Sequence, residues 1–326
     1  MKIVILDGKS LEMDGASPWG ELEGLGECTV YSETAPEKTI ERSAGADILV
    51  VNKVVLSRAT LEALPGLKCI AVTAAGTNVV DSAAAAERGI PVCNTPAYGT
   101  DAVAQHVFAL LLELCRRTGM HDVSVKNGEW DASRGFSYWL APQIDLAGKT
   151  MGIFRYGNLG KKVAEIAHAF GMKVVACSHR PQPEPGFGPF AFVSAEELFR
   201  ESDVISLNCS LNDETHYLVR RENIALMKPG VLVINTCRGA VVNSADAAAA
   251  LREGALGGLG TDVLESEPPA PDDPLLTAPN TVITPHLAWA TDSARRRIVE
   301  MTVANIRSFM AGSPTNVVNP GYARQA

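Results

Sequence analysis

Residues 150–171 read TMGIFRYGNLGKKVAEIAHAFG and lead into a second apolar stretch, Lys173–Cys177. The pattern indicates a short buried strand over Thr150–Phe154, a turn that contains Gly157 and Gly160, and a helix with an apolar stripe. A strand, a glycine turn and a helix in this order bring free backbone N–H groups and the positive end of a helix dipole to one point. The stretch therefore predicts a binding site for the pyrophosphate of a nucleotide.

Arg155 stands where such a turn usually has its first glycine. Either the backbone tolerates a side chain there or the turn is altered, and Arg155 can also add positive charge near a phosphate. An ordinary tight turn without a ligand remains the alternative. The cofactor-binding residues predicted in the turn are Arg155, Tyr156, Gly157, Asn158 and Leu159.

Strand and helix signals alternate outward from this turn along the whole chain. The other expected strands are Ile3–Leu6, Ile48–Val51, Lys68–Val72, Pro91–Cys93, Val204–Leu207, Val231–Asn235, Leu256–Thr261 and Thr281–Thr284. A long helix is expected from Thr100. From about residue 127 to residue 148 the apolar residues show no clear periodicity, and we interpret this segment as an excursion from the domain surface. The alternation predicts an α/β fold with mostly parallel, doubly wound sheets.

Composition limits the classes of protein that the chain can belong to. Its 326 residues suffice for about two domains, and 46% hydrophobic with 20% charged residues is ordinary globular composition. A net charge of −8 disfavours nucleic acid as the main partner, because phosphate binding needs a basic face. No apolar run approaches the roughly 20 residues that span a bilayer, and the N-terminus reads as a strand rather than a signal peptide. Seven dispersed cysteines suggest neither a disulfide framework nor a zinc site, so we expect a cytoplasmic protein without a metal.

Arg238, Glu267 and His286 each come shortly after an expected strand of the second series. In a doubly wound sheet, the carboxyl ends of parallel strands lie along one edge, beside the nucleotide. We therefore expect these three side chains to converge, although they are far apart in the sequence.

The three residue types suit hydride transfer between a nicotinamide cofactor and a 2-keto acid. Arg238 would bind the substrate carboxylate or carbonyl as a bidentate donor that stays charged at any working pH. His286 would donate a proton to the carbonyl oxygen in reduction and remove it in oxidation, because an unperturbed imidazole has a pKa of about 6.5 and exchanges protons near neutrality. Glu267 would fix the tautomer of the imidazole and favour its protonated form. Each residue alone is more often structural, but jointly they predict an enzyme.

The end of the strand Lys173–Cys177 carries Ser178, His179 and Arg180, with no acid before Glu184. An acid at this point normally binds the ribose hydroxyls of NAD. Arginine and serine suit a 2′-phosphate instead, through charge-assisted hydrogen bonds, while a solvent-facing turn is the alternative. The sequence predicts NADP as the cofactor, and NAD stays open.

The chain resembles the D-isomer-specific 2-hydroxyacid dehydrogenases over nearly its whole length. The matching segments are Leu67–Asp81, Val92–Arg117, Leu146–Gly171, Met227–Val242, Thr261–Pro268 and Thr284–Asn319. Val103–His106 and Pro285–Thr291 are most similar to the glycerate dehydrogenase/hydroxypyruvate reductase branch. Arg238, Glu267 and His286 all match the catalytic set of the family.

The resemblance implies reduction of glyoxylate or hydroxypyruvate to a small 2-hydroxy acid. D-lactate, phosphoglycerate and phosphite dehydrogenases are alternatives within the family, and a nucleotide-sensing scaffold similar to a corepressor is the alternative of another class. The resemblance also implies a flavodoxin-like substrate domain made of residues 1–100 and 289–326. Residues 101–288 would form a Rossmann cofactor domain, with a cleft between the two domains.

Further site residues are implied by the same resemblance. Ala75, Gly76 and Thr77 would offer backbone N–H groups to the substrate carboxylate. Asp262 would contact the nicotinamide amide, and a turn-capping aspartate is its alternative role. The remaining cofactor contacts implied by the family are Cys209, Thr215, Thr236 and Cys237.

Members of the family are homodimers through the long helix and the excursion that follows it. The resemblance places Trp139 either in the active site of the partner or in the core of its own chain. Three departures from the family pattern, at Arg155, Asn208 and Cys237, bear on the geometry of the cofactor site and leave the catalytic set intact.

Overall fold

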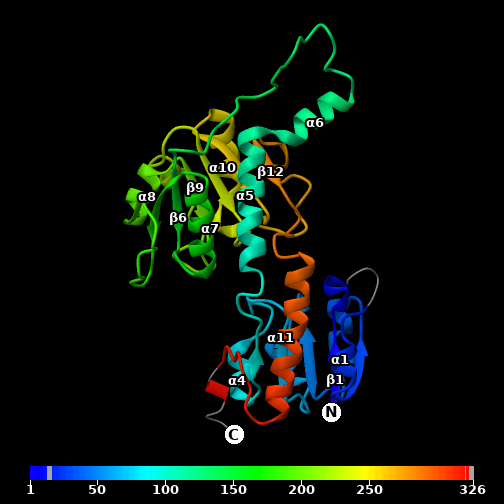
Figure 1. Cartoon of the computed structure of the whole chain (residues 1–326). Coiled ribbons are helices and arrows are strands. Elements are labelled where there is room, and N and C mark those ends of the chain that lie inside the picture. Colours follow the sequence, from blue (N-terminus) through cyan, green and yellow to red (C-terminus); the bar gives the residue numbers. More distant parts are fainter. Residues whose placement is uncertain (13–16, 320, 323–326) are drawn as a thin grey trace. The chain divides into compact units, whose positions relative to one another are not determined.

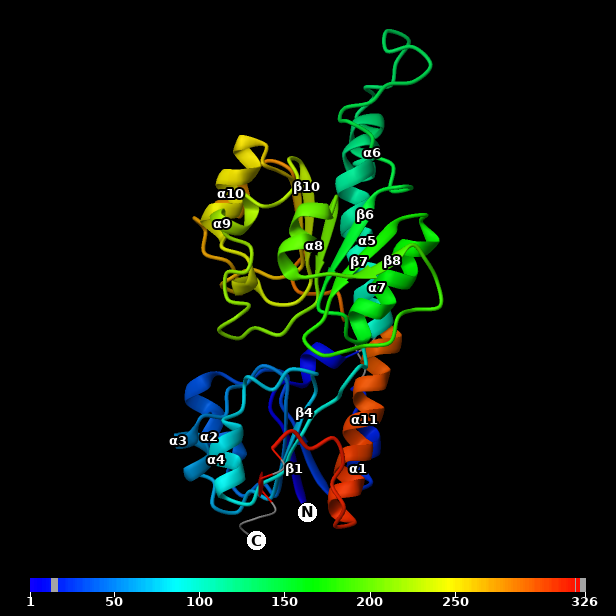
Figure 2. The ribbon, with the colours of Figure 1, turned by 90° about the vertical axis from the view of Figure 1, so that its left-hand side faces the viewer.

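The computed structural model describes residues 1–12, 17–319 and 321–322. The chain divides into two compact units, one formed by Met1–Tyr98 with Ala290–Ala326 and the other by Gly99–Trp289. Each unit has its own parallel sheet with helices on both faces, so the α/β fold expected from the sequence is confirmed (Figures 1 and 2).

In the described part of the first unit, five parallel strands lie in the order β2-β1-β3-β4-β5. This 2-1-3-4-5 order is that of flavodoxin-like folds. The strands are β1 (Lys2–Ile5), β2 (Glu27–Val30), β3 (Ile48–Val51), β4 (Cys69–Val72) and β5 (Val92–Cys93). The helices are α1 (Gly20–Glu23), α2 (Thr39–Ser43), α3 (Arg58–Glu62), α4 (Ser82–Glu87) and α11 (Asp292–Met310), with 3-10 turns at Gly8–Leu11 and Pro36–Lys38.

The two faces of this sheet are covered by different helices. Figure 2 shows α2, α3 and α4 on one face and α1 and α11 on the other. Strands β3 and β4 are buried along their whole length, because both faces are covered and their residues are almost all apolar. The chain returns after α11 to bind the edge of the sheet, where the Asn319 side chain accepts from the Val92 N–H at 2.8 Å.

The second unit holds a seven-stranded parallel sheet, all of it within the described residues, in the order β12-β11-β10-β9-β6-β7-β8. The strands are β6 (Thr150–Phe154), β7 (Lys173–Cys177), β8 (Phe190–Phe192), β9 (Val204–Leu207), β10 (Val231–Asn235), β11 (Leu256–Thr261) and β12 (Thr281–Ile283). The helices are α5 (Thr100–Arg116), α6 (Thr118–Lys126), α7 (Asn158–Ala169), α8 (Ala195–Glu201), α9 (Arg221–Ile224) and α10 (Ser244–Glu253), with 3-10 turns at Gly239–Val241 and Pro274–Thr277. The order reverses between β6 and β9, as in the Rossmann fold, where dinucleotides bind at this switch point.

The core of the second unit consists of two apolar layers, one on each face of the sheet. In β10, Val231 and Val233 face the layer beneath α8, α9 and α10, while Leu232 and Ile234 face the layer beneath α5 and α7. This alternation follows from the two-residue period of a strand. Residues 127–149, all of which the structure describes, form no helix or strand, as the sequence predicted.

Two strands were not predicted from the sequence, β2 and β8. Both lie at the edge of a sheet and are partly exposed, so neither has the continuous apolar run that marks a buried strand. Among the helices in the described ranges, none combines the length and the apolar composition that a membrane crossing requires.

Candidate active site

His286 and Glu267 form a hydrogen-bonded pair beyond the carboxyl ends of β12 and β11. The imidazole Nδ1 lies 2.6 Å from Glu267 Oε2, and the other carboxylate oxygen accepts from the Leu264 N–H at 3.2 Å. A carboxylate accepts hydrogen bonds only, so this contact puts a proton on Nδ1. Nε2 is then the nitrogen that can exchange a proton with a substrate.

The backbone at His286 has an unusual conformation, with φ +53°. Its N–H donates to the Asp262 carbonyl at 2.8 Å, and the indole N–H of Trp289 donates to the His286 carbonyl at 3.0 Å. A non-glycine residue in this region is uncommon and persists where the surroundings hold it in place. The fold therefore fixes the direction in which the imidazole points.

Asp262 is buried beneath this segment and holds it together. Its Oδ1 accepts from the Thr284 hydroxyl at 2.6 Å and from the Leu287 N–H at 2.9 Å, and its Oδ2 accepts from the Ala288 N–H at 2.8 Å. Both oxygens are thus used to cap the turn that carries His286. The structure gives Asp262 the turn-capping role, and its contact with a nicotinamide amide stays a prediction.

We expect Asp262→Asn to lower the free energy of unfolding of the second unit by about 2–3 kcal/mol, because an amide N–H₂ would face N–H and O–H donors in a buried site. Asp145→Asn is the control, since that exposed carboxylate is paired only with Arg116, at 3.1 Å, in the described chain. The control should cost less than about 1 kcal/mol. Urea denaturation measures both values, and equal losses would contradict the capping role.

His106 and Asn235 also support the site, and sequence reasoning missed both. His106 Nε2, on α5, lies 2.9 Å from the Thr284 hydroxyl and extends the network around Asp262. The Asn235 amide donates to the Arg238 carbonyl at 3.0 Å. His106 belongs to the branch-specific motif Val103–His106, which assigned it no role, and the signal at Asn235 was a lone polar residue at the end of an apolar run, which is too common to identify a site.

Arg238 lies in the turn that follows β10 and is partly buried. Its Nη1 donates to the Cys237 carbonyl at 2.6 Å. Gly239 lets this turn lie against the backbone of the next loop, since a Cβ there would come within 2.0 Å of the Leu264 carbonyl. Leu264 is also the residue whose N–H binds Glu267. The structure therefore brings the segments that carry Arg238, Glu267 and His286 together at one edge of the sheet.

The glycine turn between β6 and α7 has the shape that a pyrophosphate site needs. Gly157 is the N-cap of α7 without a capping side chain, and the space beside its Cα is open. A Cβ at Gly160 would lie 2.5 Å from the Arg155 carbonyl, so the close packing of helix on strand requires glycine. Arg155 has φ +73°, which costs a non-glycine residue roughly 1–2 kcal/mol. The turn thus keeps the glycine conformation and tolerates a side chain at its first position.

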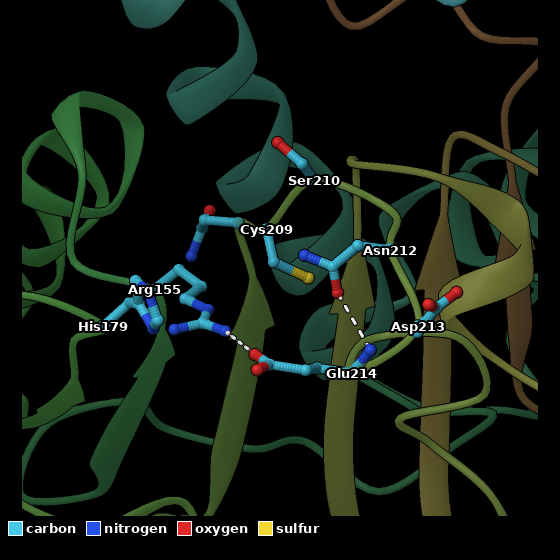
Figure 3. A pocket seen from close by; sticks show the side chains of 8 residues that line it. Arg155, His179, Cys209, Ser210, Asn212, Asp213 and Glu214 are labelled. Atoms are coloured by element: carbon cyan, nitrogen blue, oxygen red, sulfur yellow. Dashed lines mark hydrogen bonds and ion pairs between the residues drawn. The ribbon is translucent and has the colours of Figure 1, made fainter.

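A cavity of about 520 Å³ opens beside this turn (Figure 3). It is lined by Arg155, His179, Asn208, Cys209, Ser210, Asn212, Asp213 and Glu214. The backbone N–H groups of Arg155 and Tyr156 both donate to the Cys177 carbonyl at 3.1 Å, which joins the carboxyl ends of β6 and β7, next to the switch point between β6 and β9. Of the predicted cofactor residues, Arg155, His179 and Cys209 line the cavity.

The other predicted cofactor residues are placed around it. The Ser178 hydroxyl donates to the Arg180 carbonyl at 2.6 Å and shapes their turn. Thr215 is buried, and its hydroxyl donates to the Ser210 carbonyl at 2.7 Å, which anchors the loop that lines the cavity. The side chain of Tyr156 is buried in the core of the unit.

Two residues that directly follow β10, Thr236 and Cys237, have buried polar groups. The Thr236 hydroxyl is buried and has no hydrogen-bond partner among the described residues. The thiols of Cys237 and Cys209 are free and hydrogen-bonded to each other, and this hydrogen bond together with burial raises the pKa of the Cys209 thiol well above its ordinary value. An open helix N-terminus, an adjoining cavity and an orphaned hydroxyl fit a dinucleotide cofactor.

In the first unit, Ala75, Gly76 and Thr77 follow β4 in an irregular segment. In the part of the chain that the structure describes, the backbone N–H groups of these three residues donate no hydrogen bond. The Asn94 amide donates to the Ala75 carbonyl at 2.7 Å and holds the segment in place. Such N–H groups are suited to bind a carboxylate.

A parallel α/β sheet with a glycine turn at its switch point, and a hydrogen-bonded His–Glu pair on the same edge, is typical of nicotinamide-dependent oxidoreductases. Residues 108–288 match the family described as "D-isomer specific 2-hydroxyacid dehydrogenase, NAD binding domain". The chain belongs to this family. It is an enzyme that interconverts 2-hydroxy acids and 2-keto acids, which confirms the resemblance found in the sequence.

Several relatives match the chain over nearly its full length. It is 43% identical over 322 residues to a hydroxypyruvate reductase of Blautia hydrogenotrophica, covering 98% of this chain and 100% of the relative. A glycerate dehydrogenase of Methylorubrum extorquens is 40% identical over 320 residues, covering 97% and 98%. Among solved structures, an acyclic imino acid reductase in complex with NADPH and D-Arg has a TM-score of 0.86 with 29% identity, covering 98% of this chain and 100% of that chain.

Proposed function

We propose that this enzyme reduces hydroxypyruvate and glyoxylate to the corresponding 2-hydroxy acids. The observation that carries the proposal is the pairing of His286 Nδ1 with Glu267 Oε2 at 2.6 Å, on the sheet edge that also carries Arg238. The relatives named hydroxypyruvate reductase and glycerate dehydrogenase support the choice of substrate, because they match this chain along its whole length.

The roles of the side chains follow from this arrangement. A nicotinamide cofactor, when bound, supplies the hydride in reduction and accepts it in oxidation. Arg238 holds the substrate carboxylate through its planar guanidinium. His286 donates the Nε2 proton to the carbonyl oxygen, and the negative charge of Glu267 stabilises the protonated imidazole that is ready for this step.

The proposed binding residues lie in both units. The unit Gly99–Trp289 would hold the cofactor at the glycine turn, as its match to a NAD binding domain supports. The other unit would contribute the backbone N–H groups of Ala75, Gly76 and Thr77 to the substrate carboxylate.

A substrate screen tests the proposed function. Initial rates are measured with glyoxylate, hydroxypyruvate, pyruvate and bulkier 2-keto acids, each with NADH and with NADPH. We expect the highest kcat/KM for hydroxypyruvate or glyoxylate. A clear preference for pyruvate would assign the enzyme to the D-lactate branch, and reduction of none of these acids would contradict the proposal.

We further propose NADP as the cofactor. The end of β7 carries Ser178, His179 and Arg180 in place of an acid that would repel a 2′-phosphate. Arg155 and His179 add basic groups to the adjoining cavity. The related imino acid reductase was solved with NADPH, which is in keeping with this choice.

Arg180→Ala is expected to weaken kcat/KM for NADPH about tenfold and to change that for NADH less than about twofold. A charge-assisted hydrogen bond to phosphate is worth about 1.5–3 kcal/mol, and each 1.4 kcal/mol is about tenfold. Arg200→Ala is the control, because Arg200 is exposed on α8 and paired with Glu196 at 2.5 Å. Added salt should narrow the preference by screening. Equal use of both cofactors by the wild type, or a preference for NADH, would refute the proposal.

We also propose that the enzyme is a homodimer, and we narrow the interface from the long helix and the excursion to α6 and residues 127–149. Phe136 and Trp139 are 95% and 72% exposed, so Trp139 does not pack in the core of its own chain. Met120, Val123, Val125, Trp130 and Leu140 are exposed on the same two segments. A soluble monomer rarely exposes so many large apolar side chains on adjacent segments, and such a surface marks an interface.

The double variant Phe136→Ser, Trp139→Ser is expected to shift the protein toward the monomer in light scattering coupled to size exclusion. An aromatic anchor at an interface typically contributes about 2 kcal/mol or more to the association free energy, so the loss of two anchors costs several kcal/mol. Val55→Ser removes an exposed apolar side chain from the first unit and serves as the control. A wild type that is already monomeric would contradict the proposed interface.

We also propose a cytoplasmic location for the enzyme. The cysteines of the chain are free thiols in the structure, including the contacting pair Cys209 and Cys237. Seven dispersed cysteines without a Cys-x-x-Cys spacing are typical of a protein from a reducing compartment.

A further inference from the structure

Arg155 is an unusual residue for the first position of a dinucleotide-binding turn. Its backbone has φ +73°, a conformation that favours glycine, and its guanidinium Nη2 lies 3.1 Å from Glu214 Oε2 (Figure 3). Glu214 reaches it from the loop after β9 and is 70% exposed, whereas the Arg155 side chain is 24% exposed. An acid from a distant segment therefore holds a guanidinium inside the cofactor cavity.

The position of Arg155 puts that guanidinium where phosphates are expected. Its backbone N–H donates to the Cys177 carbonyl, so the side chain starts between the N-terminus of α7 and the turn after β7. The first of these places suits a pyrophosphate and the second suits a 2′-phosphate. The planar fork of a guanidinium matches a phosphate as well as it matches a carboxylate.

Glu214 is held in position by its own loop. Its backbone N–H donates to Asn212 Oδ1 at 3.0 Å, and the buried Thr215 hydroxyl anchors the same loop. Asp213, the next residue along, also lines the cavity but makes no ion pair in the part of the chain that the structure describes. Glu214 is therefore positioned to compete with a phosphate for Arg155, and Asp213 offers a matched comparison.

We propose that Arg155 and Glu214 form a charge gate in the cofactor site. Glu214 holds the Arg155 guanidinium until a phosphate of the dinucleotide displaces it, so that Arg155 strengthens cofactor binding and Glu214 weakens it. The proposal rests on the proposed cofactor role of this cavity. The chemistry recognised is a phosphate group, either the pyrophosphate or the 2′-phosphate of the cofactor.

The test measures dissociation constants for NADPH and NADH by fluorescence titration, without substrate. The proteins are the wild type, Glu214→Gln, Arg155→Gly, the double variant and the control Asp213→Asn. Glycine suits φ +73°, so we expect Arg155→Gly to fold, which thermal melting checks. Glu214→Gln should tighten binding roughly two- to fivefold, and Arg155→Gly should weaken it roughly tenfold.

The double variant decides whether the two residues act together. Without Arg155, the change Glu214→Gln should alter the affinity by less than about 1.5-fold, because there is no guanidinium left to release. A weakening in Arg155→Gly that is larger for NADPH assigns the contact to the 2′-phosphate, and an equal weakening assigns it to the pyrophosphate.

Two results would overturn the gate. The first is an equal cofactor affinity of the wild type and the Glu214→Gln variant. The second is an increase in cofactor affinity in Asp213→Asn that is as large as in Glu214→Gln, because this would show a general effect of negative charge. A wild type that binds neither dinucleotide would instead contradict the proposed function, so the two failures are distinguishable.

Discussion

His286→Ala is expected to lower kcat by about 10²–10⁴-fold, the usual contribution of general acid–base catalysis. The imidazole is held by Glu267 at 2.6 Å and by a backbone fixed on Asp262, and alanine offers no proton to a carbonyl oxygen. The cavity beside the glycine turn does not include His286, so cofactor affinity should change less than about twofold.

The control separates the loss of the imidazole from strain in the backbone. Because φ is +53° at this position, alanine is poorly suited to it, whereas asparagine adopts this region more readily. His286→Asn should keep the melting temperature of the wild type and still lose the same activity. The measurements are kcat with hydroxypyruvate, the dissociation constant of the cofactor and the melting curve. A variant with the turnover of the wild type would remove His286 from the acid–base role.

Arg238→Lys is expected to lower kcat/KM for a 2-keto acid by about 10- to 100-fold. Lysine keeps the charge but not the planar fork that binds a carboxylate with two parallel hydrogen bonds, and one such charge-assisted bond is worth about 1.5–3 kcal/mol. The turn around Arg238 is held by the Asn235 amide and by the close approach of Gly239 to Leu264. The ammonium of lysine therefore cannot regain the lost geometry through a shift of the turn.

Arg220→Lys provides the matched comparison. Arg220 is half exposed and paired with Glu222 at 3.0 Å, so its replacement should leave both kcat and KM close to those of the wild type. Steady-state kinetics with hydroxypyruvate and glyoxylate give both constants for each variant. If Arg238→Lys kept its KM and its kcat, the carboxylate would have to be bound elsewhere.

Much of the fold could be read from the sequence because the sheets are parallel and buried on both faces. Strands such as Ile48–Val51 and Val231–Asn235 are then continuous apolar runs, and glycine turns mark the helix ends. The edge strands β2 and β8 were not predicted, because their side chains are partly exposed and neither sequence has the continuous apolar run of a buried strand.

The meeting of His286 and Glu267 could also be predicted from the sequence, while their acid–base role stays a prediction. In a doubly wound sheet the carboxyl ends of the strands share one edge, so polar residues that follow successive strands must meet. His286 and Glu267 do so in the structure. The capping of their segment by Asp262, and the contact of His106 with Thr284, could not be read from any local pattern, because they depend on how the loops pack.

The parallel α/β architecture, the position of the glycine turn and the residues at the strand ends followed from the sequence alone, because burial and periodicity are local properties of the chain. Only the tertiary structure showed that Arg155 keeps the conformation of the missing glycine and meets Glu214, 59 residues away. It also decided that Trp139 lies on the surface and outside the core of its own chain. Such contacts depend on the paths of loops, which are set by long-range packing and by backbone hydrogen bonds that no spacing of residues encodes.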